Sequence, residues 1–421
     1  MKFIMHNLRM IFSRWRNNGW VLGELFLVFI VMWYLCDSLG CLKYIFYQPL
    51  GYDIEHVYRL DVSMGGESRD TTLSSAAKHV ALANLLSRME GIEAVGMCYW
   101  SLPMSGNNSF NSLNVTDSIG ITMRYVRCTD GYMKVFRFGE DPQRPFSQMP
   151  VDENSLMLSR GAYDTYSKKY PSFSLDTPLG NGGEEGFPMR AKGVIDAFRE
   201  YRYGADARWY FERIDDHLML DDEHRFWEPQ ITFRVKAEAD NPDYRQYFLD
   251  EMAPKLDIDN LFVVDAVPYT LQQEEFEVLL GDTDRINTHT VIVIFLLVNV
   301  FLGLVGTFWL RTRRRRGEIA LRLSMGSSRA QIGRLLIGEG LLLLTLVAFP
   351  AALVCYNVAI SEPALGNSAL ISLWPVEWSF IRFIVGTLAA WLLIAVMVVI
   401  GIWFPARQAM QIQPAEALHE E

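Results

Sequence analysis

The chain has 421 residues, of which 50% are hydrophobic and 21% charged, and its formal net charge is −10. This apolar and aromatic content excludes a disordered or fibrous protein. Residues 291–310 and 383–404 hold no charge, and uncharged runs of about 20 residues match the bilayer's hydrocarbon thickness, which excludes a purely soluble protein. The acidic, polar block 43–286 excludes a channel embedded along its whole length.

Residues 1–18 are predicted to form an interfacial helix on the cytoplasmic membrane surface. Ile4, Leu8 and Ile11 fall at helical spacing, while Lys2 and Arg9 lie off that stripe. An ordinary basic flank of the following span is the alternative. Residues 19–42 are predicted to be the first transmembrane helix, because their apolar core is too long for a signal peptide and lacks a small-residue cleavage site.

Residues 43–286 are predicted to form an extracytoplasmic α+β domain. Both ends of this block show a strand–helix–strand order. The expected strands are 56–62, 91–97, 121–127, 234–237 and 261–267, and the expected helices are 74–89 and 244–256. The middle, about 145–230, is rich in Gly and Pro and is interpreted as an inserted second subdomain.

The same block shows no catalytic constellation. Neither H-E-x-x-H nor G-x-S-x-G occurs in the sequence, and no Cys/His set has metal-ligand spacing. Asp215, Asp216 and His217 form the densest acid/His cluster, where a solvated acidic loop is favoured over a metal site. Cys98 and Cys128 could pair in an oxidising compartment. We expect no catalytic residue, metal, cofactor or nucleic-acid partner.

The last third of the chain contains three further predicted spans. They are the transmembrane helices 287–310, 335–360 and 380–404, and Pro350 is expected to break the second of them. A loop at 311–334, a loop at 361–379 and a tail at 405–421 complete this part. The predicted fold is an α-helical four-span bundle with a large α+β extracytoplasmic domain inserted between spans one and two.

The distribution of arginine predicts the orientation of the spans. Residues 311–334 hold eight Arg and one acid, whereas 361–379 holds two Glu and no basic residue. Positive charge favours the inner side, so both termini and loop 311–334 are expected in the cytoplasm, with 43–286 and loop 361–379 outside. Four arginines that follow the second span are expected to anchor in anionic headgroups of the bilayer. They are Arg313, Arg314, Arg315 and Arg316.

Two acidic residues, Glu24 and Glu339, lie inside predicted spans near the inner face. A charge at the membrane centre costs roughly 2.5–3.5 kcal/mol, and less near the surface. We expect Glu339 to pair with Arg334 or to cap the bundle, and Glu24 to pair with the N-terminal arginines. A role in moving a proton or substrate is the less favoured alternative.

Loop 311–334 itself contains a predicted short helix. Residues 317–323 have helical potential, and Glu318 and Arg322 are spaced as an intrahelical ion pair. Gly326 is expected to end this helix, with Ser327 or Ser328 as the N-cap of the next. A helix between two spans on the inner face is well placed to contact a cytoplasmic partner, although a plain connector would show the same pattern.

This loop resembles the signature loop of MacB/FtsX-type ABC transporter permeases. Residues 316–332 read RGEIALRLSMGSSRAQI, similar to the family pattern R-x-E-I-x-[IL]-R-x-[AS]-x-G-[AS]-[ST] followed by a basic residue, Q-I and a Glu in the next span, here Glu339. Residues 405–418, PARQAMQIQPAEAL, resemble the family ending P-A-x-x-A-x-x-x-x-P-x-x-A-L. The order of one span, a large outer domain and three spans is similar along the whole chain.

The resemblance implies a non-catalytic permease subunit of the bacterial inner membrane, driven by a separate cytoplasmic ABC ATPase. The sequence indeed has no G-x-x-x-x-G-K-[ST] phosphate loop. The helix in loop 311–334 would be the coupling helix on that ATPase. Its implied apolar anchors are Ile319, Leu323 and Met325, with Glu318, Arg322 and Arg329 as polar partners and Gly326 and Ser327 in the turn.

The resemblance also implies mechanotransmission, meaning that ATP-driven motion reaches the outer domain through stiff helices. Export or extraction of peptides, lipoproteins, lipids or drugs is expected. The alternative is an FtsX-like signalling scaffold that activates a cell-wall hydrolase, and a membrane-anchored enzyme is least favoured. Partners would include a second permease, as a homodimer or as a heterodimer with a sister chain, and a periplasmic adaptor.

Overall fold

The structure is a computed structural model that divides the chain into two compact units. The first is Met1–Ile45 with Thr283–Glu421, here named the membrane unit, and the second is Phe46–Asp282, here named the sheet domain. The described residues are 15–68, 70, 72–99, 101–106, 109–116, 118–152, 154–181, 188–204, 206–220, 228–314, 316–365 and 378–410. Most of the predicted interfacial helix 1–18, of loop 361–379 and of tail 405–421 lies outside them.

Within the part of the chain that the structure describes, four helices of the membrane unit are long and apolar enough to cross a membrane. They are α2 (Trp15–Phe46), α9 (Asp282–Arg314), α11 (Arg329–Leu365) and α12 (Phe380–Met410), and the short helix α10 (Arg316–Ser324) joins α9 to α11. The four-span prediction is confirmed. Helix α11 continues through Pro350, so the expected break there is wrong.

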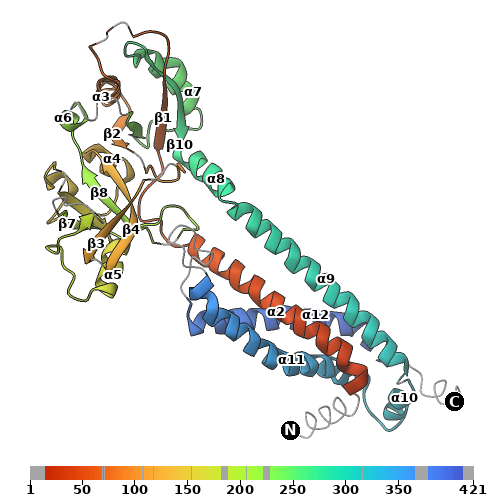
Figure 1. Ribbon diagram of the computed structural model, residues 1–421. Coiled ribbons are helices and arrows are strands. Elements are labelled where there is room, and N and C mark those ends of the chain that lie inside the picture. Colours follow the sequence, from red (N-terminus) through yellow and green to blue (C-terminus); the bar gives the residue numbers. More distant parts are fainter. Residues whose placement is uncertain are drawn as a thin grey trace. The chain divides into compact units, whose positions relative to one another are not determined.

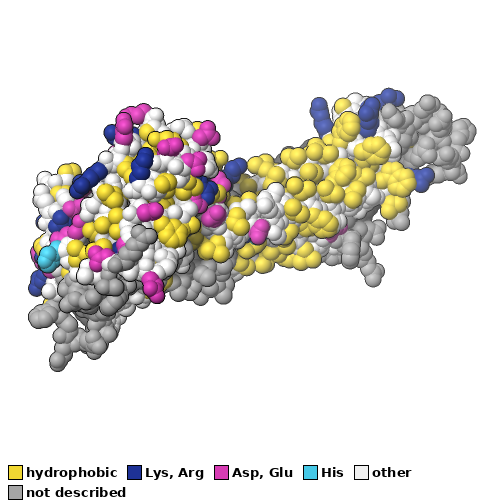
Figure 2. Space-filling view, turned by 90° about the horizontal axis from the view of Figure 1, so that it is seen from above, with side chains coloured by type: hydrophobic (Ala, Val, Ile, Leu, Met, Phe, Trp, Pro, Cys, Tyr) yellow, Lys and Arg dark blue, Asp and Glu magenta, His cyan; other side chains and the backbone are white. Residues whose placement is uncertain are grey.

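The long helices run alongside one another around a common apolar core (Figure 1). Phe29, Leu304, Leu344 and Ile394, one from each helix, are buried in it. Close approach is built into helix α11 at Gly340, where an added Cβ would lie 2.9 Å from Val398 Cγ1, as expected where small residues let membrane helices pack closely. On the face seen in Figure 2, hydrophobic side chains cover these helices, and Lys and Arg gather at one end.

The described residues of the sheet domain form one ten-stranded sheet. The strand order is β10-β1-β9-β2-β4-β8-β5-β7, and β3 pairs with β4 and β6. Pairs β4–β8 and β5–β7 are parallel, and the other pairs are antiparallel. The strands are β1 (Val57–Met64), β2 (Ile92–Tyr99), β3 (Phe110–Thr116), β4 (Ile119–Cys128), β5 (Ser155–Ser159), β6 (Gly180–Asn181), β7 (Arg190–Ile195), β8 (Trp209–Arg213), β9 (Gln230–Val235) and β10 (Leu261–Pro268).

Side chains alternate between the two faces of this sheet, and helices cover both faces. Helices α4 (Asp130–Phe136) and α8 (Tyr269–Leu279) contribute to the core on one face. Helices α3 (Ser75–Leu86), α6 (Asp216–Met219) and α7 (Tyr244–Tyr247) contribute to the core on the other. The predicted β-α-β ends of the domain are confirmed, since β1, α3 and β2 open it and β9, α7 and β10 close it.

The middle of the domain continues the same sheet. Strands β5, β7 and β8 extend it beyond β4, and helix α5 (Arg160–Lys169) packs a separate apolar cluster around Leu158 and Tyr166. The Ser159 hydroxyl starts α5 by accepting a hydrogen bond from Ala162 N. The division into two subdomains stays a prediction.

Candidate functional site

The turn between α10 and α11 is fixed by its own hydrogen bonds. Gly326 has φ +94°, a left-handed conformation that favours glycine. Its N–H donates to Leu323 O at 3.1 Å, and Ser327 N–H donates to Arg322 O at 3.0 Å. This pair of bonds is a Schellman motif, which satisfies the last carbonyls of a helix. The prediction that Gly326 ends the helix is confirmed.

The next helix begins with an equally complete cap. Gln331 N–H donates to the Ser328 hydroxyl at 3.3 Å, and Ser328 N–H donates to Gln331 Oε1 at 2.8 Å. This reciprocal arrangement is a capping box, in which two backbone donors are satisfied by side chains. Of the two serines expected as the cap, Ser328 fills the role. Because both helix ends are capped internally, the turn holds its shape without a partner.

Helix α10 divides its apolar residues between two faces. Ile319 and Ala320 are buried in the core of the membrane unit, and Leu323 packs partly against it. Leu321 and Met325, by contrast, are 50% and 71% exposed. They stand four residues apart and so share one face of the helical turn. Of the three expected anchors, Met325 is thus exposed, while Ile319 faces inward.

Polar groups surround this exposed pair. Arg322 donates to Glu318 Oε1 at 3.0 Å, and both side chains are partly exposed. Arg329 and Arg334 are also exposed, and the expected pairing of Glu339 with Arg334 stays a prediction. The result is a small apolar knob, Leu321 and Met325, inside a charged rim. We name this set of residues the α10 tip.

Two arginines of the membrane unit lie over tryptophan rings of their own helices. Arg313 is 4.9 Å from the centroid of Trp309 on α9, and Arg407 is 5.4 Å from that of Trp403 on α12. Trp309 Nε1–H also donates to Gln408 Oε1 at 3.1 Å. Trp beside Arg is typical of the level of the lipid headgroups. The side chains of Arg314, Arg315 and Arg316 lie outside the described residues.

The two intramembrane acids have different surroundings. Glu339 is buried, with 4% of its surface exposed. Glu24 is half-buried, and its carboxylate lies so close to α9 that a Cβ on Gly303 would be 2.8 Å from Glu24 Oε1. A cavity of about 10 Å³ adjoins this contact, which is room for about one water molecule. Gly303 therefore makes space for a carboxylate between two helices.

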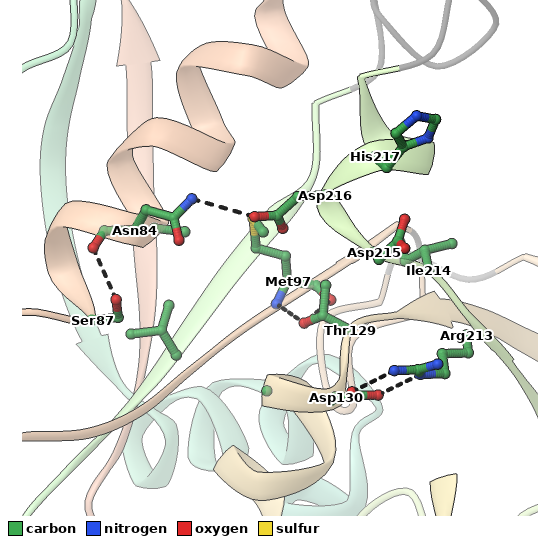
Figure 3. Close-up of a pocket in the computed structure, with 13 residues that line it drawn as sticks. Asn84, Ser87, Met97, Thr129, Asp130, Arg213, Ile214, Asp215, Asp216 and His217 are labelled. Carbon is green, nitrogen blue, oxygen red and sulfur yellow. Dashed lines mark hydrogen bonds and ion pairs between the residues drawn. The ribbon is translucent and has the colours of Figure 1, made fainter. Parts of the chain in front are cut away.

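The sheet domain contains an open cleft of about 440 Å³. It lies between helix α3, strand β2, the start of α4 and the β8–α6 connection (Figure 3). Arg213 forms a two-point ion pair with Asp130, with N–O distances of 2.7 and 2.8 Å. Thr129 Oγ1 accepts from Met97 N at 3.0 Å. Several polar side chains that line the cleft are thus already hydrogen-bonded within the domain.

The acid/His cluster predicted from the sequence borders this cleft. Asp215 caps helix α6 by accepting from Leu218 N, and Asp216 lies 3.4 Å from Asn84 Nδ2. Figure 3 shows His217 pointing away from Asp216. Asp216–Met219 is helical rather than the expected loop, and Asp221–His224 lies outside the described residues. Among the described residues, no three His, Cys, Asp or Glu side chains could hold a metal ion.

Cys98 and Cys128 lie directly opposite each other in the β2–β4 pair. Both are buried and both are free thiols. Burial raises the pKa of each thiol above its usual value, so the thiolate that exchange chemistry needs is disfavoured here.

Residues 290–414 match the FtsX-like permease C-terminal family. These residues, here named the FtsX-like domain, are thus similar to that family over less than half of the chain. The FtsX-like domain contains most of α9 and all of α10, α11 and α12, and therefore includes the α10 tip. The predicted resemblance to MacB/FtsX-type permeases is confirmed. No curated protein matches the chain by sequence.

Several solved structures are similar to this chain at low identity. A permease-protein domain from Porphyromonas gingivalis is 9% identical, with a TM-score of 0.35, over 51% of this chain and 90% of that one. The periplasmic region of MacB from Actinobacillus actinomycetemcomitans is 13% identical, with a TM-score of 0.34, over 55% of this chain and 97% of that one. The extracellular domain of the noncanonic ABC-type transporter YknZ from Gram-positive bacteria is 11% identical, with a TM-score of 0.31, over 50% of this chain and 100% of that one.

A further polar contact joins the FtsX-like domain to the first span. Asp37 on α2 accepts two hydrogen bonds from Arg382 on α12. The sequence does not reveal this pair, because Arg382 stands directly before an uncharged run. An Arg at that place is typical of the end of a span. Only the packing of α2 against α12 brings Arg382 to its partner Asp37.

Proposed function

We propose that this chain is the membrane subunit of an ABC transporter whose ATPase is a separate cytoplasmic subunit, and that the α10 tip is the surface that binds it. The observation that carries the proposal is the exposed pair Leu321 and Met325 on a fully capped turn of the FtsX-like domain. An exposed Leu and Met on one face of a rigid turn offer an apolar contact to a partner, and a flexible Met side chain adapts well to an apolar groove.

The two faces of α10 support a role in force transmission. Ile319 and Ala320 hold the helix against the bundle core, while Leu321 and Met325 remain for the partner. Pressure on the tip therefore acts on the core through a short helix and a rigid turn. Helices in lipid keep their backbone hydrogen bonds, so they act as stiff levers. This arrangement favours mechanotransmission, which needs no solvated path through the bundle.

The proposed location is the bacterial inner membrane with both termini in the cytoplasm. The basic loop 311–334 supports this orientation through the positive-inside rule. The Arg313–Trp309 and Arg407–Trp403 contacts support a headgroup level at the same end. The sheet domain is then periplasmic. A second copy or a sister permease would complete a symmetric assembly around two ATPase subunits, and a periplasmic adaptor would extend it.

Export or extraction of peptides, lipoproteins, lipids or drugs is the proposed activity. The alternative is an FtsX-like scaffold that activates a cell-wall hydrolase. An ATPase-dead partner separates the two activities. Loss of export with unchanged release of cell-wall fragments supports the transporter, whereas loss of cell-wall turnover supports the scaffold.

Co-purification of ATP hydrolysis tests the proposal. The chain is isolated from its native membrane, and ATPase activity per mole of chain is measured for the wild type and for Met325→Asp and Leu321→Asp. Both variants should lose the activity. Leu220→Asp is the matched control, because Leu220 is an exposed leucine of the sheet domain. Activity retained in both tip variants would reject the assignment of the binding surface.

A further inference from the structure

Both chain connections of the sheet domain contact one short segment, residues 197–204. The first connection is 46–50, which follows the end of helix α2 at Phe46. The second is helix α8, which follows β10 and ends at Leu279. Residues 197–204 lie far from both in the sequence, between β7 and β8. We name this segment the strap.

The strap contacts the first connection mainly through hydrogen bonds from Arg199. This side chain is buried, with only 4% of the residue's surface exposed. Its Nε donates to Pro49 O at 3.2 Å, a terminal nitrogen donates to Gln48 O, and its backbone N–H donates to Leu50 O at 2.9 Å. A buried guanidinium needs such acceptors, because desolvation without them is costly. The 48–50 backbone is thus held at three successive carbonyls.

Shape and a tyrosine reinforce this contact. Gly51 has φ +87°, and an added Cβ there would lie 2.6 Å from Phe198 Cα. The glycine therefore lets the two backbones touch. Tyr52 donates from its hydroxyl to Glu200 O at 2.6 Å. Phe198 in turn packs edge-on against Phe138 and Trp209 of the sheet core, with centroid distances of 5.0 and 5.6 Å.

The same strap reaches helix α8 through its next residues. Arg202 Nε is 3.2 Å from Glu277 Oε1, and Gln273 Nε2 donates to that same oxygen at 2.8 Å. The Tyr201 ring packs edge-on against Phe276 at 5.3 Å. Arg202 also lies over the Phe46 ring at 5.2 Å. One side chain therefore contacts both connections.

We propose that the strap ties the two connections into one mechanical unit, so that displacement of either is carried to the other and to the sheet. Arg199 is the principal anchor because it is buried, while the Arg202–Glu277 pair is partly exposed and contributes less. Both arginines act by holding other groups in position: Arg199 holds the backbone of residues 48–50, and Arg202 holds Glu277. The inference deepens the proposed function, because it says how motion of two spans would reach the domain together.

Distance measurement on the chain alone tests the strap without any ATPase. Spin labels are placed at Tyr47→Cys and Leu279→Cys, both 73% exposed and one on each connection. The five native cysteines are replaced by alanine, and the labelled full chain is studied in lipid nanodiscs by pulsed electron resonance. The intact strap should give one narrow distance distribution.

Arg199→Leu and Arg202→Glu should each widen that distribution by about twofold or more, because local segments open once their contacts are lost. The double variant Arg202→Glu with Glu277→Arg should narrow it again. If Arg199→Leu fails to fold, the two Arg202 variants decide the matter. A distribution of wild-type width in Arg202→Glu, or no narrowing in the double variant, would overturn the proposal.

Two controls keep this result separate from the proposed function. Arg88→Glu changes an exposed arginine just after α3 and should leave the distribution unchanged. Met325→Asp, which removes the proposed ATPase contact, should also leave it unchanged. If Met325→Asp loses ATPase binding but keeps the narrow distance distribution, both proposals are upheld. If Met325→Asp widens the distance distribution, the strap does not act by itself.

Discussion

Asp37 and Arg382 form a bidentate ion pair between the first and fourth spans of the membrane unit. Arg382 Nε donates to Asp37 Oδ1 at 2.9 Å, and the second guanidinium nitrogen donates to Oδ2. Their side chains are only 5% and 10% exposed. The pair fixes which faces of α2 and α12 meet.

Breaking this pair should cost far more stability than breaking a surface pair. Asp37→Asn or Arg382→Gln leaves a buried group uncompensated, which costs about 3–5 kcal/mol. Glu318→Gln breaks the partly exposed pair with Arg322 and should cost at most about 0.5 kcal/mol. Unfolding of the chain in nanodiscs measures both. Equal losses in the two variants would show that the buried pair does not hold the spans together.

Gly326→Ala should destabilise the α10–α11 turn. A residue with a Cβ in the left-handed region costs about 1–2 kcal/mol, and Gly326 has φ +94°. Thermal unfolding and hydrogen exchange at the Gly326 and Ser327 amides report on the turn. Gly306→Ala is the control, since no atom lies within 4 Å of an added Cβ there. Equal protection of these amides in Gly326→Ala would mean that the Schellman bonds do not depend on glycine.

Gly340→Ala should loosen the contact between α11 and α12. The new methyl group would overlap Ile402 and approach Val398 at 2.9 Å. Overpacking of this kind costs about 1–3 kcal/mol. Adding Ile402→Ala should recover part of the loss, because it creates room for the methyl group. A double variant no more stable than Gly340→Ala would argue that the two helices do not meet at this point.

The sheet domain should lose stability on mild acidification through His79. Burial lowers the pKa of this imidazole, although hydrogen bonding to Ser75 O and the charge of Glu228 act against the shift. The unfolded chain therefore binds a proton more readily than the folded one as the pH falls below about 6.5. Stability is full above that pH and declines below it.

His79→Gln should flatten this pH dependence. The melting temperature is compared at pH 7.5 and pH 5.5 for the variant and the wild type. The variant should show the smaller decrease, because glutamine does not titrate. The same decrease in both chains would assign the acid sensitivity to other groups.

Local signals in the sequence predicted the spans and the helix caps. A bilayer requires uncharged runs long enough to cross it, so α9 and α12 could be located from composition alone. The left-handed turn at Gly326 and the cap at Ser328 depend on adjacent residues, and these too were predictable. The strand–helix–strand order at both ends of the sheet domain was predictable from alternating apolar residues and from the turn at Gly91, which has φ +85°.

Contacts between distant segments were not predictable. The sequence places apolar residues on more than one face of α10, and only the bundle decides that Ile319 turns inward and Leu321 outward. Nothing near Asp37 indicates Arg382 as its partner. The strap lies in a stretch interpreted as an inserted subdomain, where no local pattern shows that Arg199 would meet residues 48–50.

Photo-crosslinking from position 325 shows whether the α10 tip contacts an ATPase. A photoreactive phenylalanine analogue replaces Met325 in living cells, and the crosslinked product is identified by mass spectrometry. We expect an adduct between position 325 and an ATPase that carries a nucleotide-binding phosphate loop, and no such adduct from the buried position 319 or from the control position 220. If position 325 crosslinked only to lipid or to extracytoplasmic proteins, the α10 tip would not be the ATPase-binding surface.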